Sequence, residues 1–203
     1  MIKLFDEIPE MKNERVLLRP IERKDLPALS EMTGDPEVYR FLPTFLYEQK
    51  YDDKNLMLDR MEEECIRTKD TILLAVCPAD EQDTFMGIAE IYNYEPQKEK
   101  ASIGYRLCRE FWGRGIASEV TGLLKKYLLE RTDVRKITAH VMVENKASAK
   151  VLLKNGFFPK WQNLSEDWGR PENVTVDKYR FKLSPEEKAE TLRFGLQHRQ
   201  ITL

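Results

Sequence analysis

The stretch Glu110-Phe-Trp-Gly-Arg-Gly-Ile-Ala-Ser-Glu119 decides how the rest of the 203-residue chain is interpreted. Its two glycines lie between a strand-like run that ends near residue 107 and a helical pattern that begins near residue 115. Glycine permits positive φ and close approach of the backbone, and the first turn of a helix leaves N–H donors unpaired. The helix dipole favours an anion there by roughly 0.3–1 kcal/mol. The stretch therefore predicts a phosphate-binding turn, to which Arg114 adds a positive charge.

Other nucleotide-binding motifs can be compared with this turn directly. The dinucleotide fingerprint requires a third glycine where this chain has Ser118. A Walker loop requires Gly-Lys followed by Ser or Thr, and the sequence contains no such run. Both motifs are excluded, whereas the glycine pair taken alone is equally compatible with an ordinary turn.

Strand-like runs and helical patterns surround the turn. After residue 115, apolar residues recur at helical spacing from Ile116 to Leu128 and predict a helix of about four turns. Further helices are predicted over 25–32, 52–69 and 147–154, and strands over 15–20, 71–77, 85–92, 101–107, 136–143 and 174–183. Short turns join the strands between 71 and 107, which favours an antiparallel meander. Together these elements predict an α/β (α+β) fold with three αβα layers around a mixed, mostly antiparallel sheet.

Composition limits the domain organisation and the partners. Residues 1–183 are expected to form one domain, and residues 184–203 a C-terminal helical tail. The 33 Lys and Arg against 35 Asp and Glu give no basic surface of the kind that nucleic acids require. No apolar run is long enough for a signal peptide or a membrane span. We therefore expect a cytoplasmic protein with no nucleic-acid or membrane partner, and a homodimer remains open.

Cysteine and histidine usage argues against a metal site. Cys65, Cys77 and Cys108 are widely spaced and form no Cys-x-x-Cys pair, and the histidines are only His140 and His198. We therefore expect no disulfide framework and no metal. Cys108 and His140 are interpreted as packing residues.

Three motifs in a fixed order carry a resemblance to a known family. They are Ile103-Gly-Tyr-Arg-Leu, Phe111-Trp-Gly-Arg-Gly-Ile-Ala-Ser-Glu and Asn145-Lys-Ala-Ser-Ala-Lys-Val-Leu-Leu-Lys-Asn-Gly-Phe157. In this order they resemble the GNAT acetyltransferases. Glu14-Arg-Val-Leu-Leu-Arg-Pro and Asp35-Pro-Glu-Val-Tyr-Arg-Phe-Leu-Pro are similar to the subgroup that acetylates the N-terminal alanine or serine of ribosomal proteins. The resemblance covers residues 14–158.

The resemblance implies the GNAT fold, acetyl-coenzyme A as the acetyl donor, and a set of binding residues. The turn would bind the pyrophosphate, and the backbone at Leu107 and Cys108 would pair with the pantetheine arm between two splayed strands. Asn145 would hydrogen-bond the arm, although an Asn at this position is also an ordinary helix N-cap. The implied coenzyme-binding residues are Leu107, Cys108, Trp112, Gly113, Arg114, Gly115, Ile116, Ala117, Asn145 and Ser148.

The implied chemistry is direct attack of a primary amine on the thioester. Ser148 would donate a proton to the leaving sulfur. If a base acts, Glu90 is the first candidate, followed by Glu95 and Glu99, and each is more readily interpreted as a solvated charge. Leu152 replaces a tyrosine that serves many family members as general acid, and Ser102 replaces a frequent carboxylate. These departures keep a second hypothesis open, a coenzyme A-binding regulatory module with impaired catalysis; an unrelated nucleotide-binding α/β protein is a third.

The acceptor would be a primary amine: a protein N-terminus, a polyamine or a small amine. At pH 7 about 10 to 15% of an α-amine is uncharged, against roughly 0.04% of a lysine amine, so a weak amine reacts with little base assistance. The aromatic loop from Tyr39 to Tyr51 is expected to cover the acceptor or to act as a plain hydrophobic lid. The acidic residues that would suit a cationic acceptor, or form a solvated helix face, are Asp52, Asp53, Glu62, Glu63 and Glu64.

Overall fold

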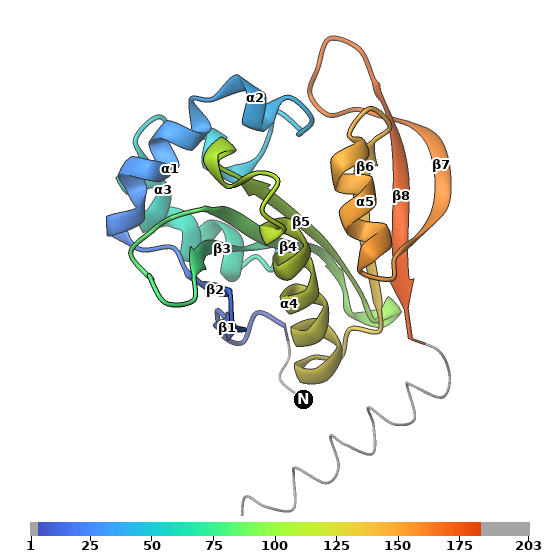
Figure 1. Cartoon of the computed structure of the whole chain (residues 1–203), viewed down its shortest axis with the longest axis horizontal. Coiled ribbons are helices and arrows are strands. Elements are labelled where there is room, and N and C mark those ends of the chain that lie inside the picture. Colours follow the sequence, from blue (N-terminus) through green and yellow to red (C-terminus); the bar gives the residue numbers. More distant parts are fainter. Residues whose placement is uncertain (1–3, 184–203) are drawn as a thin grey trace, which may run out of the picture.

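The computed structural model describes residues 4–183, which form one eight-stranded sheet with helices on both faces (Figure 1). The strands are β1 Met11–Lys12, β2 Val16–Pro20, β3 Thr71–Pro78, β4 Gly87–Glu95, β5 Lys100–Leu107, β6 Lys136–Met142, β7 Phe158–Glu166 and β8 Val174–Lys182. Their order in the sheet is β1-β2-β3-β4-β5-β6-β8-β7. Every neighbouring pair is antiparallel except β5 and β6, which are parallel. The predicted mixed, mostly antiparallel sheet is confirmed.

The helices divide between the two faces of the sheet. They are α1 Leu26–Thr33, α2 Pro36–Tyr39, α3 Lys54–Met61, α4 Ile116–Arg131 and α5 Lys146–Lys154. One core cluster joins α4 to alternate strand residues such as Leu74, and the other joins α1 and α3 to the intervening residues such as Leu73. Because successive side chains of a strand point to opposite faces, each strand supplies both cores. The three-layer arrangement is confirmed.

The parallel pair β5 and β6 stays together only at its beginning. The paired residues are Lys100 with Lys136, Ala101 with Ile137, and Ser102 with Thr138. Beyond this point β5 remains paired with β4 as far as Leu107, while β6 remains paired with β8 as far as Met142. The two strands therefore separate in the middle of the sheet and leave facing backbone edges, which an extended ligand can pair with. The Ser102 and Thr138 hydroxyls, 2.9 Å apart, hydrogen-bond at the point of separation.

Two elements differ from the sequence prediction. The sequence does not predict β7, because the strand lies at the edge of the sheet and none of its nine residues is buried: seven are exposed and two are half-buried, so no apolar alternation arises. The helix predicted over 52–69 is shorter. Regular α3 ends at Met61 and continues as a π-helical turn, Glu62–Ile66, while Met57, Met61 and Cys65 keep the buried stripe.

The predicted helical tail over 184–203 lies outside the described residues. Within residues 4–183, no helix is both long and apolar enough to span a bilayer. The same residues contain no group of three His, Cys, Asp or Glu side chains arranged to hold a metal ion.

The packing of α4 on the sheet predicts a stability difference between two leucines. Leu124 of α4 is fully buried, so Leu124→Ala should lower the free energy of unfolding by about 2–5 kcal/mol. Leu56 of α3 is 41% exposed, and the matched change Leu56→Ala should stay within about 0.5 kcal/mol. Urea unfolding followed by circular dichroism measures both; equal losses would contradict the layer assignment.

Candidate active site

The glycine turn between β5 and α4 has the backbone geometry of an anion site. Gly113 and Gly115 have φ of 72° and 81°, in the left-handed region that glycine occupies without strain, and Gly115 is the N-cap of α4. No atom lies within 4 Å of the position that a Cβ on Gly113 would occupy. The residues from Trp112 to Gly115 are exposed. The N-terminal amides of α4, which starts at Ile116 and Ala117, are thus approached across an open surface.

Arg15 holds this turn from the side, which the sequence did not indicate. Its guanidinium donates to the Arg114 carbonyl at 2.8 Å and forms an ion pair with Glu119 at 3.4 Å. Asn13 donates to the same Glu119 carboxylate at 3.0 Å. Arg15 therefore fixes the turn and adds a second positive charge beside Arg114.

The end of β5 presents Leu107 toward the separated edge. The Cys108 N–H donates to the Met86 carbonyl at 3.0 Å, on the side of β4. Backbone groups alternate along a strand, so those of Leu107 point the other way, and its carbonyl accepts the Trp112 indole N–H at 2.8 Å. Burial raises the pKa of the Cys108 thiol to about 12, so it stays protonated and is a poor nucleophile. The backbone groups at this strand end that point away from β4 are therefore those of Leu107, and pairing of Leu107 or Cys108 with the pantetheine arm stays a prediction.

The start of α5 crosses the separation and meets β5. The Asn145 side-chain oxygen accepts the Ser148 N–H at 3.1 Å, so Asn145 is an N-cap, while its amide NH₂ end is chemically suited to a ligand. The Tyr105 hydroxyl donates to Ser148 Oγ at 3.2 Å. Leu152, where the resemblance suggests a tyrosine, is buried in the core and has no proton to give. Ser148 and Tyr105 are thus the hydroxyl groups at this position.

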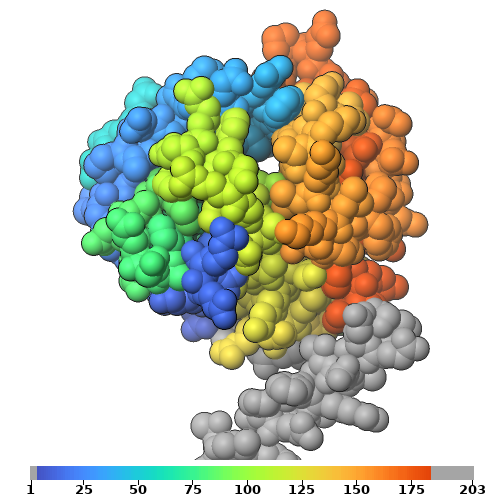
Figure 2. All heavy atoms as spheres, in the orientation of Figure 1, coloured from blue at the N-terminus to red at the C-terminus, as the bar shows by residue number. Residues whose placement is uncertain are grey.

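These residues lie around a hollow in the surface. Figure 2 shows it between the yellow-green residues near 110 and the orange residues of α5, in line with the separation of β5 and β6 in Figure 1. The predicted coenzyme-binding residues therefore form two groups. The turn and Leu107 lie on one side, and Asn145 and Ser148 on the other.

Glu90 is not the solvated charge that the sequence suggested. Its side chain is buried and accepts from Arg106 at 2.5 Å and from Thr71 at 3.1 Å. Arg106 also donates to buried Glu48 at 2.5 Å. Burial lowers the pKa of Arg106, but the two carboxylates outweigh it and raise that pKa. The interpretation of Glu90 as a solvated charge is wrong. Arg106 pairs with Ile88, two residues from Glu90 on the same face of the sheet, and from there its side chain reaches both carboxylates.

Glu90 and Ser148 lie on opposite faces of the sheet. Glu90 pairs with Gly104 on β5 and shares the face covered by α1 and α3. Tyr105, which holds Ser148, packs on the α4 face. Glu95 hydrogen-bonds Lys100 and Lys98, which lower its pKa to about 2, so it is a weak base.

A second carboxylate lies beyond the separation on the α1 and α3 face. His140 of β6 hydrogen-bonds Glu166 of β7 through Nδ1 at 2.9 Å. The Trp168 indole donates to the same Glu166 oxygen at 3.0 Å. His140 is hydrogen-bonded, as a packing residue would be, but its partner is a carboxylate on a strand that the sequence did not predict.

The aromatic loop contacts the hairpin loop that follows β7, across the top of the molecule in Figure 1. The Arg170 guanidinium donates to the carbonyls of Arg40 at 2.6 Å and Leu42 at 3.1 Å. The Thr44 N–H donates to the Trp168 carbonyl at 2.9 Å. These bonds join the two halves of the molecule on the side that carries Glu90 and Glu166.

The acidic residues near α3 are largely engaged with neighbours. Asp53 caps α3, Glu62 and Glu63 pair with Arg67, and Glu64 accepts from Tyr51. Such surface pairs contribute little stability but reduce the negative charge available to a cation.

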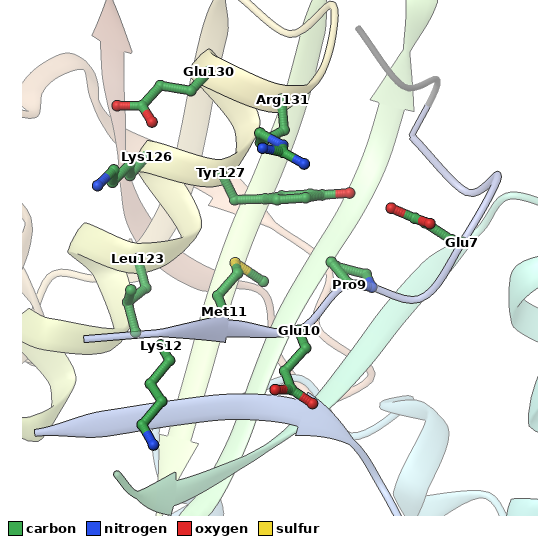
Figure 3. Close-up of a pocket in the computed structure, with 10 residues that line it drawn as sticks. All are labelled: Glu7, Pro9, Glu10, Met11, Lys12, Leu123, Lys126, Tyr127, Glu130 and Arg131. Atoms are coloured by element: carbon green, nitrogen blue, oxygen red, sulfur yellow. The ribbon is translucent and has the colours of Figure 1, made fainter. Parts of the chain in front are cut away.

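Another surface hollow lies between the N-terminal segment and α4 (Figure 3). Its charged residues are Glu7, Glu10, Glu130, Lys12, Lys126 and Arg131, and its walls include Met11, Leu123 and Tyr127. Acidic and basic groups are balanced there, which does not suit a polyphosphate. None of the predicted site residues lines it.

Comparison with known proteins identifies the family of this site. Residues 15–158 match the family model described as the acetyltransferase (GNAT) domain. The chain belongs to the GNAT acetyltransferase family. It is an N-acetyltransferase by family, and acetyl-coenzyme A is the donor substrate of such enzymes.

Individual relatives agree with this assignment. The chain is 28% identical to an uncharacterized N-acetyltransferase, p20, of Bacillus licheniformis over 87% of this chain and 96% of the relative. The spermidine N-acetyltransferase of Vibrio cholerae, solved with coenzyme A and spermine, superposes with a TM-score of 0.70 at 18% identity, covering 89% of this chain and 99% of that one. RimL, a ribosomal-protein alpha-N-acetyltransferase solved with coenzyme A, gives 0.70 at 20% identity, covering 87% and 97%.

The turn geometry predicts a loss of coenzyme affinity in Gly115→Asp. The substitution adds a negative charge and a side chain at φ 81°, so the dissociation constant for coenzyme A should rise at least about tenfold, or 1.4 kcal/mol. The same substitution at Gly34, whose φ is −82°, is the control and should leave the affinity unchanged. Isothermal titration calorimetry measures both. Unchanged affinity in a folded Gly115→Asp protein would contradict the phosphate site.

Proposed function

We propose that this GNAT enzyme binds acetyl-coenzyme A across the separation of β5 and β6 and transfers the acetyl group to a primary amine that carries one positive charge. The observation that carries the proposal is the separation itself, flanked by the glycine turn on one side and Ser148 on the other. A peptide α-amine is the favoured acceptor class.

The donor half of the site is built on the α4 face. The pyrophosphate oxygens would accept hydrogen bonds from the backbone N–H groups at the start of α4, and Arg15 and Arg114 would supply positive charge. The pantetheine arm would lie along the exposed edge of β5 near Leu107, with the Asn145 amide beside it. The thioester would then reach the place where Tyr105 meets Ser148.

The acceptor half would lie on the opposite face, between the aromatic loop and the β7–β8 hairpin. A polyamine would require several unpaired carboxylates. Glu48 and Glu90 share the single positive charge of Arg106, which leaves one net negative charge in that buried cluster. Near α3, Glu63 pairs with Arg67 and Glu64 accepts from Tyr51. This charge balance favours an acceptor with a single amine over a polyamine. The acceptor would then be of the kind named for RimL, a protein α-amine, and not of the kind named for the spermidine acetyltransferase.

Ser148 would stabilise the leaving sulfur. Burial raises the pKa of Tyr105, so its hydroxyl remains protonated and donates to Ser148 Oγ. Because Ser148 Oγ accepts the Tyr105 hydrogen bond, the single proton of the Ser148 hydroxyl stays available for the sulfur. When the amine nitrogen bonds to the carbonyl carbon, the C–S bond breaks and sulfur takes its electron pair. The acceptor attacks as the uncharged amine, after its ammonium proton has passed to water; the nitrogen then loses one further proton, the sulfur gains one, and coenzyme A leaves as the thiol.

A panel of amines tests the proposed function. Coenzyme A release, corrected for thioester hydrolysis, should be faster with Ala- or Ser-initiated peptides than with spermidine or free lysine. Release with spermidine alone would overturn the acceptor class. No release with any amine, despite coenzyme A binding, would favour the regulatory-module hypothesis.

Ser148 and Tyr105 should act as one unit. Ser148→Ala should lower kcat by about 10-fold or more with little change in KM for acetyl-coenzyme A, because the contact strengthens as the sulfur gains charge. Tyr105→Phe removes only the hydroxyl and should lower kcat in the same direction. In the Ser148→Ala background the tyrosine change should have no further effect, as steady-state kinetics of the double-mutant cycle would show. Additive losses would separate the two residues.

A further inference from the structure

His140 occupies a defined place beside the separation of β5 and β6. Ser102 and Thr138 are the last paired residues, and two residues further along the same face come Gly104 on β5 and His140 on β6. His140 is therefore the first side chain of β6 on the α1 and α3 face beyond the point of separation. The corresponding residue of β5 is Gly104, and a Cβ there would lie 3.6 Å from Glu90 Oε2 and 3.7 Å from a ring carbon of Tyr92, so Glu90 and Tyr92 of β4 border the same face of the separation.

The Glu166 carboxylate fixes the imidazole. Glu166 Oε2 lies 2.9 Å from His140 Nδ1 and also accepts the Trp168 indole N–H at 3.0 Å. In a neutral ring, Nδ1 then carries the proton and Nε2 carries the lone pair. Within residues 4–183, Nε2 has no hydrogen-bond partner. The ring thus has a fixed tautomer with its acceptor nitrogen unused.

Burial, with help from two lysines, lowers the pKa of His140 and favours the neutral ring. Burial lowers the pKa of His140 from its usual 6.5, the Glu166 hydrogen bond raises it, and nearby Lys178 and Lys100 lower it, with a net downward direction. Glu166 comes from β7, Lys178 from β8 and Lys100 from β5, while Tyr92 of β4 lies close enough to be influenced by Glu166. For Glu166, burial is outweighed by the His140 and Trp168 hydrogen bonds, which lower its pKa and keep it ionised.

Glu90, the carboxylate first considered as a base, differs in its surroundings. Both of its oxygens accept hydrogen bonds, one from Arg106 and one from Thr71. Both carboxylate oxygens of Glu90 are therefore already engaged, and its nearest charged neighbour is the Arg106 guanidinium. His140 has the opposite arrangement, with a carboxylate that stabilises the protonated ring.

We propose that His140 is the general base of the acetyl transfer and that Glu166 is its positioning residue. The inference rests on the proposed function, because it places the thioester at the separation. His140 Nε2 takes one proton from the acceptor nitrogen as the N–C bond forms and the C–S bond breaks. The sulfur leaves with the electron pair, and the proton on the imidazolium passes to the thiolate or to water, which restores the neutral ring.

The pH dependence of kcat/KM tests this assignment with three variants. Protonated His140 cannot act as a base, so kcat/KM of the wild type should fall as the pH drops through the pKa of His140. This fall is the acid limb of the pH profile. His140→Gln should lose about 10²-fold or more and lack this acid limb. Glu166→Gln removes a negative charge and should move the limb to lower pH with a reduced rate. Lys178→Met removes a positive charge and should move the limb to higher pH.

The outcomes separate this inference from the proposed function. Opposite shifts of the acid limb in Glu166→Gln and Lys178→Met, with unchanged coenzyme A affinity, support His140 as the base. A folded His140→Gln enzyme with the wild-type limb and a rate within about threefold overturns it, and loss of the limb in Glu90→Gln instead reassigns the base. Coenzyme A binding without transfer to any amine defeats the proposed function itself.

Discussion

The separation of β5 from β6 after Ser102 and Thr138 is the constraint on which the rest of the structure depends. In a continuous sheet both edges would be paired and the interior would be closed. Here β4 holds β5 and β8 holds β6, so each strand is anchored on its far side. The Ser102–Thr138 hydroxyl pair ends the parallel ladder. The result is an opening in the middle of the sheet between two strands that are each held on their far side.

The two faces of this opening carry different chemistry. On the α4 face lie the glycine turn, Arg15 and the Tyr105–Ser148 pair, which suit a phosphate-bearing thioester and its sulfur. On the α1 and α3 face lie His140, Glu166 and the loops joined by Arg170. Strand alternation produces this division, because Tyr105 and Arg106 are neighbours in sequence but point to opposite faces. Donor and acceptor can then meet at the opening without sharing a binding surface.

The sequence predicted the parts of the site that are local. The glycine turn, the helix after it and the cap at Asn145 each depend on a few adjacent residues, so spacing and residue type were sufficient. The strand motif Ile103-Gly-Tyr-Arg-Leu places Tyr105 and Arg106 on opposite faces by alternation, but it does not indicate which distant side chains they meet. A residue's face of the strand can be predicted from alternation, whereas its partners across the fold cannot.

Other parts depend on contacts between distant residues. Arg106 and Glu48 are 58 positions apart, and nothing in the aromatic loop marks Glu48 as buried. The edge strand β7 is exposed along most of its length and gives no apolar alternation, so Glu166 could not be placed beside His140. For that reason the sequence alone indicates a packing role for His140 and a solvated carboxylate at Glu90.

A crystal structure of the protein with acetyl-coenzyme A, or with a thioether analogue that cannot transfer, tests the central claim most directly. The account predicts the pyrophosphate at Gly113–Ala117, the pantetheine arm between β5 and β6, and the acetyl group beside Gly104 and His140. Coenzyme bound elsewhere, for example in the hollow between β1 and α4 (Figure 3), with the opening between β5 and β6 left empty, would contradict it.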